Sequence, residues 1–322
     1  MHLQPARARR AITAIAVLVL AGLLGAAPGA LAAGAGPTPA PGPRPEDGTP
    51  APPGSNDWAC RPRAAHPRPV VLVHGLTTNM NEDWLTLAPR LHDAGYCVFA
   101  LTYGESPYLE NRGGYLRMQD SAVELDSFVT RVLAATGAAQ IDLVGHSEGT
   151  VMPQWWLRKM GGARLTHAYV AITPLYDGTT LYGVDSLLAN LKALNPEQAA
   201  GISKGFDDSF CGACQQLLRG SDFFKELYAD GTIAAPGVTY TTVMTRTDEL
   251  VIPYTSGYLH APGATNIVLQ DLCPLDLSDH LLISFDPVVH QIVLNALDPL
   301  HAKSVNCGPV AGLGYGPLRL QQ

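Results

Sequence analysis

Residues 141–149 read Ile-Asp-Leu-Val-Gly-His-Ser-Glu-Gly, and this stretch decides the fold. Residues 141–144 have the apolar character of a buried strand, and a helix-like stretch begins at Gly149. Between them lies Gly-x-Ser-x-Gly, in the strand–turn–helix setting that exposes a nucleophilic serine. The bare pattern also occurs by chance in loops, but both flanking elements are present here. We therefore expect Ser147 at the tip of a sharp turn, where Gly145 and Gly149 avoid clashes that larger residues would make.

Strands and helices alternate along most of the chain. Continuous apolar runs predict strands over residues 69–73, 96–102, 141–144, 168–172, 238–244 and 266–269. Apolar residues at helical spacing predict helices over residues 114–136, 149–159 and 287–297. This alternation predicts an α/β fold with a mostly parallel sheet and helices on both of its faces.

Residues 177–231 interrupt the alternation and are too long for a simple connection. We expect a mainly helical insertion above the C-terminal edge of the sheet, over the active-site edge. Its apolar residues could form a lid or an acyl-binding wall, or could pack as an ordinary helical excursion, and the sequence favours neither. These residues are Leu187, Leu188, Leu191, Leu194, Phe206, Phe210, Phe223 and Phe224.

The N-terminal residues are expected to lie outside the folded domain. Residues 1–32 combine a basic start, an apolar stretch and the small-x-small pattern Ala30-Leu31-Ala32, which together predict a secretory signal peptide. A membrane anchor is the alternative, but the apolar stretch is short for a span. Residues 33–57 are rich in Pro, Ala and Gly and are interpreted as a linker. A single α/β domain is then expected over residues 58–322.

Charge and composition narrow the function further. The formal net charge is −7 at pH 7, and 47% of the residues are hydrophobic. An acidic surface argues against a nucleic-acid partner and fits an uncharged substrate. No stretch after residue 32 is predicted to span a membrane, so we expect a secreted, extracellular mature chain. The oligomeric state does not follow from the sequence.

Six cysteines follow the predicted signal peptide, and an even number in a secreted chain favours disulfides. Their order suggests the pairs Cys60–Cys97, Cys211–Cys214 and Cys273–Cys307, among the many pairings that six cysteines allow. Cys211 and Cys214 could instead form a redox or zinc motif. The redox setting and a second ligand pair are both missing, so we expect a structural disulfide and no metal site.

A serine hydroxyl becomes a good nucleophile when a histidine accepts its proton and a carboxylate holds that histidine. After a Gly-x-Ser-x-Gly turn, the carboxylate follows a late strand and the histidine comes after the last strand. Asp248 directly follows the strand predicted over residues 238–244, and it is our first choice for the carboxylate. Glu249 and Asp177 are its rivals.

Position selects His280 among the ten histidines, because it lies between the last predicted strand and the last helix. A turn histidine paired with its neighbour Asp279 is the alternative role. The remaining candidates lie before that strand, in or after the final helix, far from strand ends, or beside the serine but pointing away: His260, His290, His301, His92, His167 and His146. The backbone N–H groups of Leu76 and Glu148 are expected to bind an oxyanion, with His74 bracing the Leu76 loop.

Four segments resemble the secreted class 2 lipases of actinobacteria. They are PVVLVHG at residues 69–75, VGHSEG at 144–149, TRTDELVIPYTSG at 245–257 and CPLDLSDH at 273–280. The similarity extends over about residues 58–310, and it implies an α/β-hydrolase that cleaves acylglycerols and other carboxylic esters without a cofactor. The family's serine, aspartate and histidine positions then fall on Ser147, Asp248 and His280.

Two residues depart from the family pattern. Glu148 stands where Gln is frequent, which is expected to add a negative charge beside an oxyanion donor. Thr247 stands where an aromatic residue is frequent. Both differences bear on substrate range more than on the chemistry.

The leading hypothesis is a secreted serine ester hydrolase that acts on an ester or acylglycerol through an acyl-serine intermediate. An acyltransferase that passes the acyl group to an alcohol through the same three residues is the first alternative. A non-catalytic binding module on a hydrolase fold is the second. It is disfavoured because none of the three residues is missing, and a peptidase is disfavoured by the resemblance.

Overall fold

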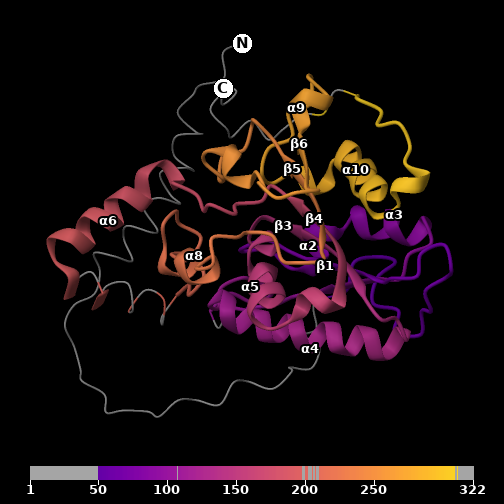
Figure 1. Ribbon diagram of the computed structural model, residues 1–322, viewed down its shortest axis with the longest axis horizontal. Coiled ribbons are helices and arrows are strands. Elements are labelled where there is room, and N and C mark those ends of the chain that lie inside the picture. The colour runs from indigo at the N-terminus through magenta and orange to yellow at the C-terminus, as the bar shows by residue number, and fades with distance from the viewer. Residues whose placement is uncertain are drawn as a thin grey trace.

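The computed structural model describes residues 50–106, 108–197, 200–201, 205, 207, 210–308 and 310. The predicted signal peptide, most of the predicted linker and Phe206 lie outside these residues. Within them the chain forms one sheet with helices on both faces (Figure 1). No helix of the described ranges is long and apolar enough to cross a membrane.

The sheet contains six strands in the described part of the chain, in the order β2-β1-β3-β4-β5-β6. The strands are β1 (Val70–Val73), β2 (Val98–Leu101), β3 (Ile141–His146), β4 (Thr166–Ile172), β5 (Thr239–Met244) and β6 (Thr265–Val268). All neighbours pair in parallel, where the sequence predicted a mostly parallel sheet. The order reverses between β1 and β3, and the C-terminal ends of strands at such a switch point are where ligands bind in open α/β sheets.

Helices cover the sheet in two layers (Figure 1). Helices α4 (Met118–Thr136), α5 (Met152–Lys159) and α8 (Asp222–Leu227) pack on one face. Helices α2 (Met80–Trp84), α3 (Leu87–Asp93) and α10 (Pro287–Leu297) pack on the other. Two further helices are α6 (Val184–Leu194) and α9 (Leu269–Leu272). The segments after β1 and β3 therefore cover opposite faces, which opens the edge between those strands.

Strand β1 shows how the sequence builds this three-layer core. Val71 and Val73 point into the layer of α4 and α5, whereas Val70 and Leu72 point into the layer of α3 and α10. All four side chains are fully buried. A strand buried on both faces needs apolar residues at every position, which explains the uninterrupted run in the sequence.

Two helices begin later than the sequence predicts. The helix expected from residue 114 begins at Met118, and it ends as expected at Gly137, which adopts a left-handed conformation with φ of 71°. The helix expected from Gly149 begins at Met152, after a 3-10 helix, η1 (Ser147–Thr150). The tight 3-10 turn satisfies the first backbone groups after the strand before the wider α5 can begin.

The packed structure also begins earlier than residue 58. Asn56, within the predicted linker, donates its backbone N–H to Val98 O at 2.9 Å. Its side-chain amide exchanges hydrogen bonds of 2.8 and 2.9 Å with the backbone of Ala100. The predicted linker boundary is therefore too late, because a polar side chain here completes the exposed edge of β2.

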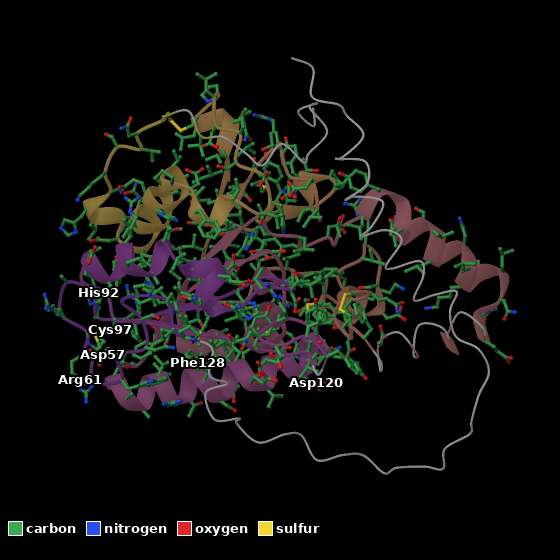
Figure 2. All side chains as sticks on the ribbon, turned by 180° about the vertical axis from the view of Figure 1, so that it is seen from behind. Asp57, Arg61, His92, Cys97, Asp120 and Phe128 are labelled. Carbon is green, nitrogen blue, oxygen red and sulfur yellow. A yellow bond between two sulfur atoms is a disulfide. The ribbon has the colours of Figure 1, made fainter. Side chains whose placement is uncertain are left out.

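The Cys60–Cys97 disulfide fastens this N-terminal segment to the residue before β2. Figure 2 shows Asp57 and Arg61 on the same side of the molecule as Cys97. The bridge thus adds a covalent link to the hydrogen bonds with β2 and to the packing of Trp58 against Phe99 and Phe128.

Candidate active site

The turn after β3 places Ser147 at the C-terminal edge of the sheet. Ser147 has a φ of 54°, a left-handed conformation that costs free energy in a non-glycine residue and is typical of functional turns. A Cβ added to Gly145 would lie 1.9 Å from Gly149 O, and one added to Gly149 would lie 2.1 Å from Val73 O. Both positions therefore exclude any side chain, as the motif predicts.

Three predicted residues meet at this edge. The Nε2 atom of His280 lies 2.8 Å from Ser147 Oγ, and its Nδ1 atom lies 3.0 Å from Asp248 Oδ2. Asp248 and His280 are only 2% and 3% exposed, so the hydrogen bond between them is shielded from water, whereas Ser147 is half-buried. The alternative of a turn histidine paired with Asp279 does not describe this ring, since its two nitrogen atoms face Asp248 and Ser147.

Backbone and charge hold the Asp248–His280 pair in place. Asp248 Oδ1 accepts hydrogen bonds from the N–H groups of Leu250 and Val251, at 3.0 and 2.7 Å. Burial by itself lowers the pKa of His280, but the charge and hydrogen bond of Asp248 outweigh it, so the pKa of the imidazole is raised above 6.5. The ring is thereby oriented, and its protonated form is stabilised.

The two rival acids have different surroundings. Glu249 Oε2 accepts the backbone N–H of His280 at 3.0 Å, so this carboxyl contacts the backbone of the histidine rather than its ring. Burial raises the pKa of Glu249 to about 7. Asp177 is 69% exposed and forms an ion pair with Arg219 at 3.0 Å, outside the triad arrangement.

The loop after β1 passes over the serine. A Cβ on Gly75 would lie 3.1 Å from Ser147 Cβ, which shows how closely this backbone approaches. The next residue is Leu76, and the loop is held by Thr77, whose N–H donates to Gly113 O at 3.0 Å. Glu148, as the second residue of η1, has no acceptor for its N–H inside that helix. The N–H groups of Leu76 and Glu148 are thus carried by the two segments that flank Ser147.

Asp83 and His146 lie behind this edge, and the sequence analysis did not predict their contact. Nδ1 of His146 lies 2.9 Å from Asp83 Oδ1, and its Nε2 lies 2.9 Å from His280 O. Asp83 Oδ2 also accepts the Gly75 N–H at 2.9 Å. Burial alone raises the pKa of Asp83, but its contacts with His146 and Gly75 more than offset this and lower it. This buried pair links the β1 loop, the serine turn and the His280 loop.

The surroundings of Glu148 disfavour the negative charge that the sequence led us to expect. Its side chain is fully buried, and burial raises the pKa of the carboxyl well above its usual value. Contact with Tyr103 does not offset this rise. Burial thus favours the carboxylic acid over the carboxylate, because the charged form loses its hydration.

The cysteines form the three pairs that their order suggests. The Cys273–Cys307 bridge encloses the segment that carries His280. The Cys211–Cys214 bridge lies in the insertion, where Gly212 N–H donates to Tyr115 O at 2.7 Å, close to the start of α4. Groups of three or more His, Cys, Asp or Glu arranged to hold a metal ion are not found within the described ranges.

The described phenylalanines of the insertion differ in burial. Phe223 and Phe224 are buried in the core, and Phe223 stacks on Trp155 of α5 with ring centroids 5.5 Å apart. These contacts favour a packing role for both residues over an acyl-binding wall. Phe210 is 41% exposed and meets Tyr115 edge-on.

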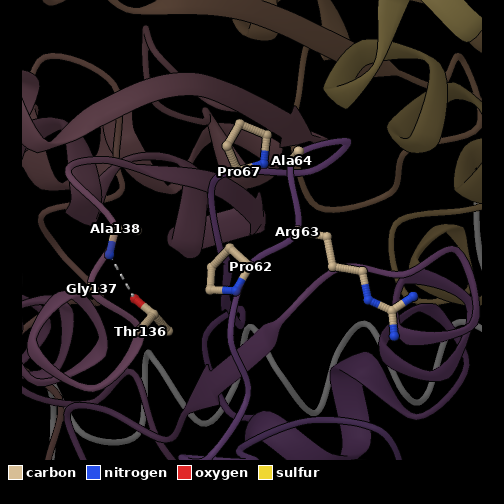
Figure 3. A pocket seen from close by; sticks show the side chains of 7 residues that line it. All are labelled: Pro62, Arg63, Ala64, Pro67, Thr136, Gly137 and Ala138. Carbon is tan, nitrogen blue, oxygen red and sulfur yellow. Dashed lines mark hydrogen bonds between the residues drawn. The ribbon is translucent and has the colours of Figure 1, made fainter.

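A separate pocket lies at the opposite end of the sheet. Its lining residues precede β1 and β3, whereas Ser147 follows β3 (Figure 3). They are Pro62, Arg63, Ala64, Pro67, Thr136, Gly137 and Ala138. This pocket is therefore not part of the triad site.

The parallel sheet and the serine turn define the class of protein, which is an α/β-hydrolase fold. The family described as Lipase (class 2) matches residues 67–292, and the chain belongs to this family. Aspergillus fumigatus lipase B is a structural relative with a TM-score of 0.58 and 17% identity, over 85% of this chain and 68% of that one. Mature Bacillus licheniformis lipase BlEst2 has a TM-score of 0.51 and 18% identity, over 74% and 94%.

Two curated triacylglycerol lipases are similar over a shorter stretch. The one from Pseudarthrobacter phenanthrenivorans is 33% identical over 95 residues, which are 27% of this chain and 27% of that protein. The one from Burkholderia plantarii is 33% identical over 95 residues, 27% of this chain and 24% of that protein. The chain thus spans about a quarter of the length of these relatives.

Proposed function

We propose that this chain hydrolyses carboxylic esters, including acylglycerols, through an acyl-serine intermediate. The observation that carries the proposal is the 2.8 Å contact between His280 Nε2 and Ser147 Oγ, with Asp248 on the other ring nitrogen. The family supports ester hydrolysis, because its description is that of a lipase.

In the acylation step, Ser147 Oγ attacks the ester carbonyl carbon while its proton passes to His280 Nε2. The carbonyl electron pair moves onto oxygen, and the N–H groups of Leu76 and Glu148 bind that oxyanion. When the C=O bond re-forms, the alcohol leaves with the proton from His280, and the acyl group remains on Ser147. Asp248 stabilises the transient imidazolium.

Deacylation repeats these steps with water. His280 removes a proton from the water molecule, whose oxygen attacks the acyl carbon and releases the carboxylic acid. Ser147 recovers its proton from His280. An alcohol in place of water would give a new ester, so the ratio of acid to new ester measures transferase activity directly.

We further propose that the protein works outside the cell. The three disulfides suit an oxidising compartment, and the pattern of residues 1–32 matches a secretory signal. N-terminal sequencing of protein from the culture medium of an expressing host tests this location. Recovery of the chain only inside cells would contradict it.

A fluorophosphonate probe tests the chemistry in one experiment. We expect covalent labelling of Ser147, located by peptide mass spectrometry, and release of fatty acid from tributyrin in the unlabelled protein. Ser147→Ala is the matched control and should lose both signals, with activity lower by several orders of magnitude. Its melting temperature should stay within a few degrees, since the residue lies at the tip of a turn. Labelling elsewhere, or more than about a tenth of the activity in Ser147→Ala, would exclude this mechanism.

A further inference from the structure

In the proposed reaction, Glu148 acts through its backbone N–H group, and its side chain has no role. That side chain is fully buried, and neither carboxyl oxygen has a hydrogen-bond donor among the residues that the structure describes. The Tyr103 hydroxyl is its polar neighbour. Tyr103, however, donates its single proton to His74 O at 2.9 Å, so only its oxygen lone pairs are left for Glu148.

Burial is the largest influence on the pKa of Glu148, and Tyr103 is the one group that acts against it among the described residues. A Cβ built on Gly114 would lie 2.8 Å from Glu148 Oε2, so that oxygen packs against a Cα–H group. Both Glu148 and Arg112 act on Tyr115, before α4, but burial has the largest effect there too and raises the pKa of Tyr115. A buried carboxylate without donors or a cation is costly, whereas a carboxylic acid can donate its own proton.

Two polar contacts of the His74 ring go to the backbone. Its Nδ1 atom lies 2.7 Å from Gly75 O, and its Nε2 atom accepts the Tyr103 N–H at 3.3 Å. An Nε2 that accepts a hydrogen bond carries no proton, so these two contacts fit a ring that is protonated on Nδ1. The same ring stacks on Tyr103, with centroids 4.4 Å apart.

We propose that Glu148 is a positioning residue that works as a neutral carboxylic acid, donating its proton to Tyr103, which in turn donates to His74 O. This chain of hydrogen bonds starts at the residue that carries one oxyanion N–H and ends two residues before Leu76, which carries the other. It fixes the two oxyanion donors relative to each other. The inference rests on the proposed function in one respect, which is that these hydrogen bonds support an oxyanion site.

Loss of the Glu148 proton would have two effects. The carboxylate would face the lone pairs of Tyr103, which breaks the chain. It would also put a negative charge beside the oxyanion that forms in the transition state, where like charges repel strongly in a shielded site. Both effects act on the transition state more than on bound substrate, so kcat should fall at alkaline pH with little change in KM.

Kinetics across pH test this role in the full-length chain. Tributyrin hydrolysis is followed by titration of the released acid, for the wild type, Glu148→Gln and the control Glu124→Gln, each profile scaled to its own maximum. Glu124, on α4, accepts the Gly104 N–H at 3.0 Å, so it is a carboxyl of the same region with a backbone donor. On the alkaline side of the pH profile, we expect kcat of the wild type and Glu124→Gln to fall about tenfold per pH unit.

Glu148→Gln should not show this alkaline fall in kcat, since its amide donates to Tyr103 without titrating. An unchanged alkaline fall in Glu148→Gln would overturn the proposal.

Infrared spectroscopy detects the proton on Glu148 without an activity assay. The wild type minus Glu148→Gln difference spectrum at neutral pH should contain the carbonyl band of a protonated carboxylic acid, and carboxylate bands in its place would overturn the proposal. If Glu148→Gln does not fold, the spectrum of Tyr103→Phe is compared with that of the wild type instead. Loss of the Tyr103 acceptor should shift the carbonyl band of Glu148. An unshifted band would refute the hydrogen bond from Glu148 to Tyr103. A chain that hydrolyses no ester but shows the band would refute the proposed function and leave the protonated Glu148 in place.

Discussion

The edge around Ser147 and the insertion at residues 177–231 differ in how their side chains are held. At the edge, Asp248 and His280 are almost fully buried, and each makes several hydrogen bonds. In the insertion, Val184 is the only buried residue of α6, and Leu194 is 83% exposed. Figure 1 shows α6 at the end of the molecule, away from the sheet. Buried polar groups demand partners and so fix geometry, whereas an apolar helix face is not fixed until it is covered.

The insertion is itself divided. Its helix α8 packs against α5, and Phe223, Phe224 and Leu227 of α8 are buried. Helices α6 and α8 thus differ in their packing, since α8 completes the core and α6 presents leucines to solvent. Variants in each region can separate this packing from the chemistry at the edge.

The largest expected effect is that of Asp248→Asn. It should lower kcat by about 10⁴-fold, because the amide no longer holds the histidine tautomer that accepts the serine proton. Asp177→Asn is the matched control at the start of the insertion and should change kcat less than about twofold, as expected for an exposed ion pair. Steady-state rates on p-nitrophenyl butyrate measure both. A more damaging Asp177→Asn would reverse the assignment of the acid.

Phe223→Ser should mainly affect stability. Removing a buried aromatic ring typically costs about 3–5 kcal/mol of the free energy of unfolding, here with loss of the Trp155 stacking. Denaturant unfolding measures this change, and rates on acetate, butyrate and long-chain esters should fall alike. Phe210→Ser, at an exposed position, is the control and should cost less than about 1 kcal/mol. Selective loss of long-chain turnover in Phe223→Ser would restore the acyl-wall hypothesis for this residue.

Glu249→Gln should change the pH dependence of stability. Burial raises the pKa of Glu249 in the folded state to about 7, from an ordinary 4.5. Between those values the folded state binds more protons than the unfolded state, so the free energy of unfolding falls as pH rises, by about 3 kcal/mol from this group. Urea unfolding from pH 4 to 8 should show that fall in the wild type and in the exposed control Glu226→Gln, but not in Glu249→Gln. Parallel curves for all three proteins would contradict the buried neutral form.

The smallest effect is expected on α6. Leu191 is 41% exposed, so Leu191→Ser should leave the melting temperature nearly unchanged. If its side chain shields acyl chains, the change should lower turnover of long-chain esters about threefold relative to butyrate, the scale of a modest loss of apolar contact. Lys192→Ser, one residue further on the polar side, is the control. Equal rates across the ester series would leave α6 without a role in acyl binding.

Sequence reasoning grouped Ser147, Asp248 and His280 because each lies in a segment that follows a strand of a parallel sheet. The C-terminal ends of parallel strands lie at one edge, so positions far apart in the chain could be assigned to one place. The same reasoning missed the pair of Asp83 and His146, because these residues are 63 positions apart and Asp83 belongs to no motif. It also did not foresee the raised pKa of Glu148, because the residue type does not say whether water reaches the side chain.

The sequence by itself determined the alternation of strands and helices, the serine turn and the order of the three predicted catalytic residues, since these depend on local spacing and on the steric limits of glycine. Tertiary structure alone decided which apolar residues of the insertion are buried, where the packed chain begins and which carboxyl groups have raised pKa values. Burial and protonation depend on all the groups that surround a side chain, and packing brings those groups together from distant parts of the chain.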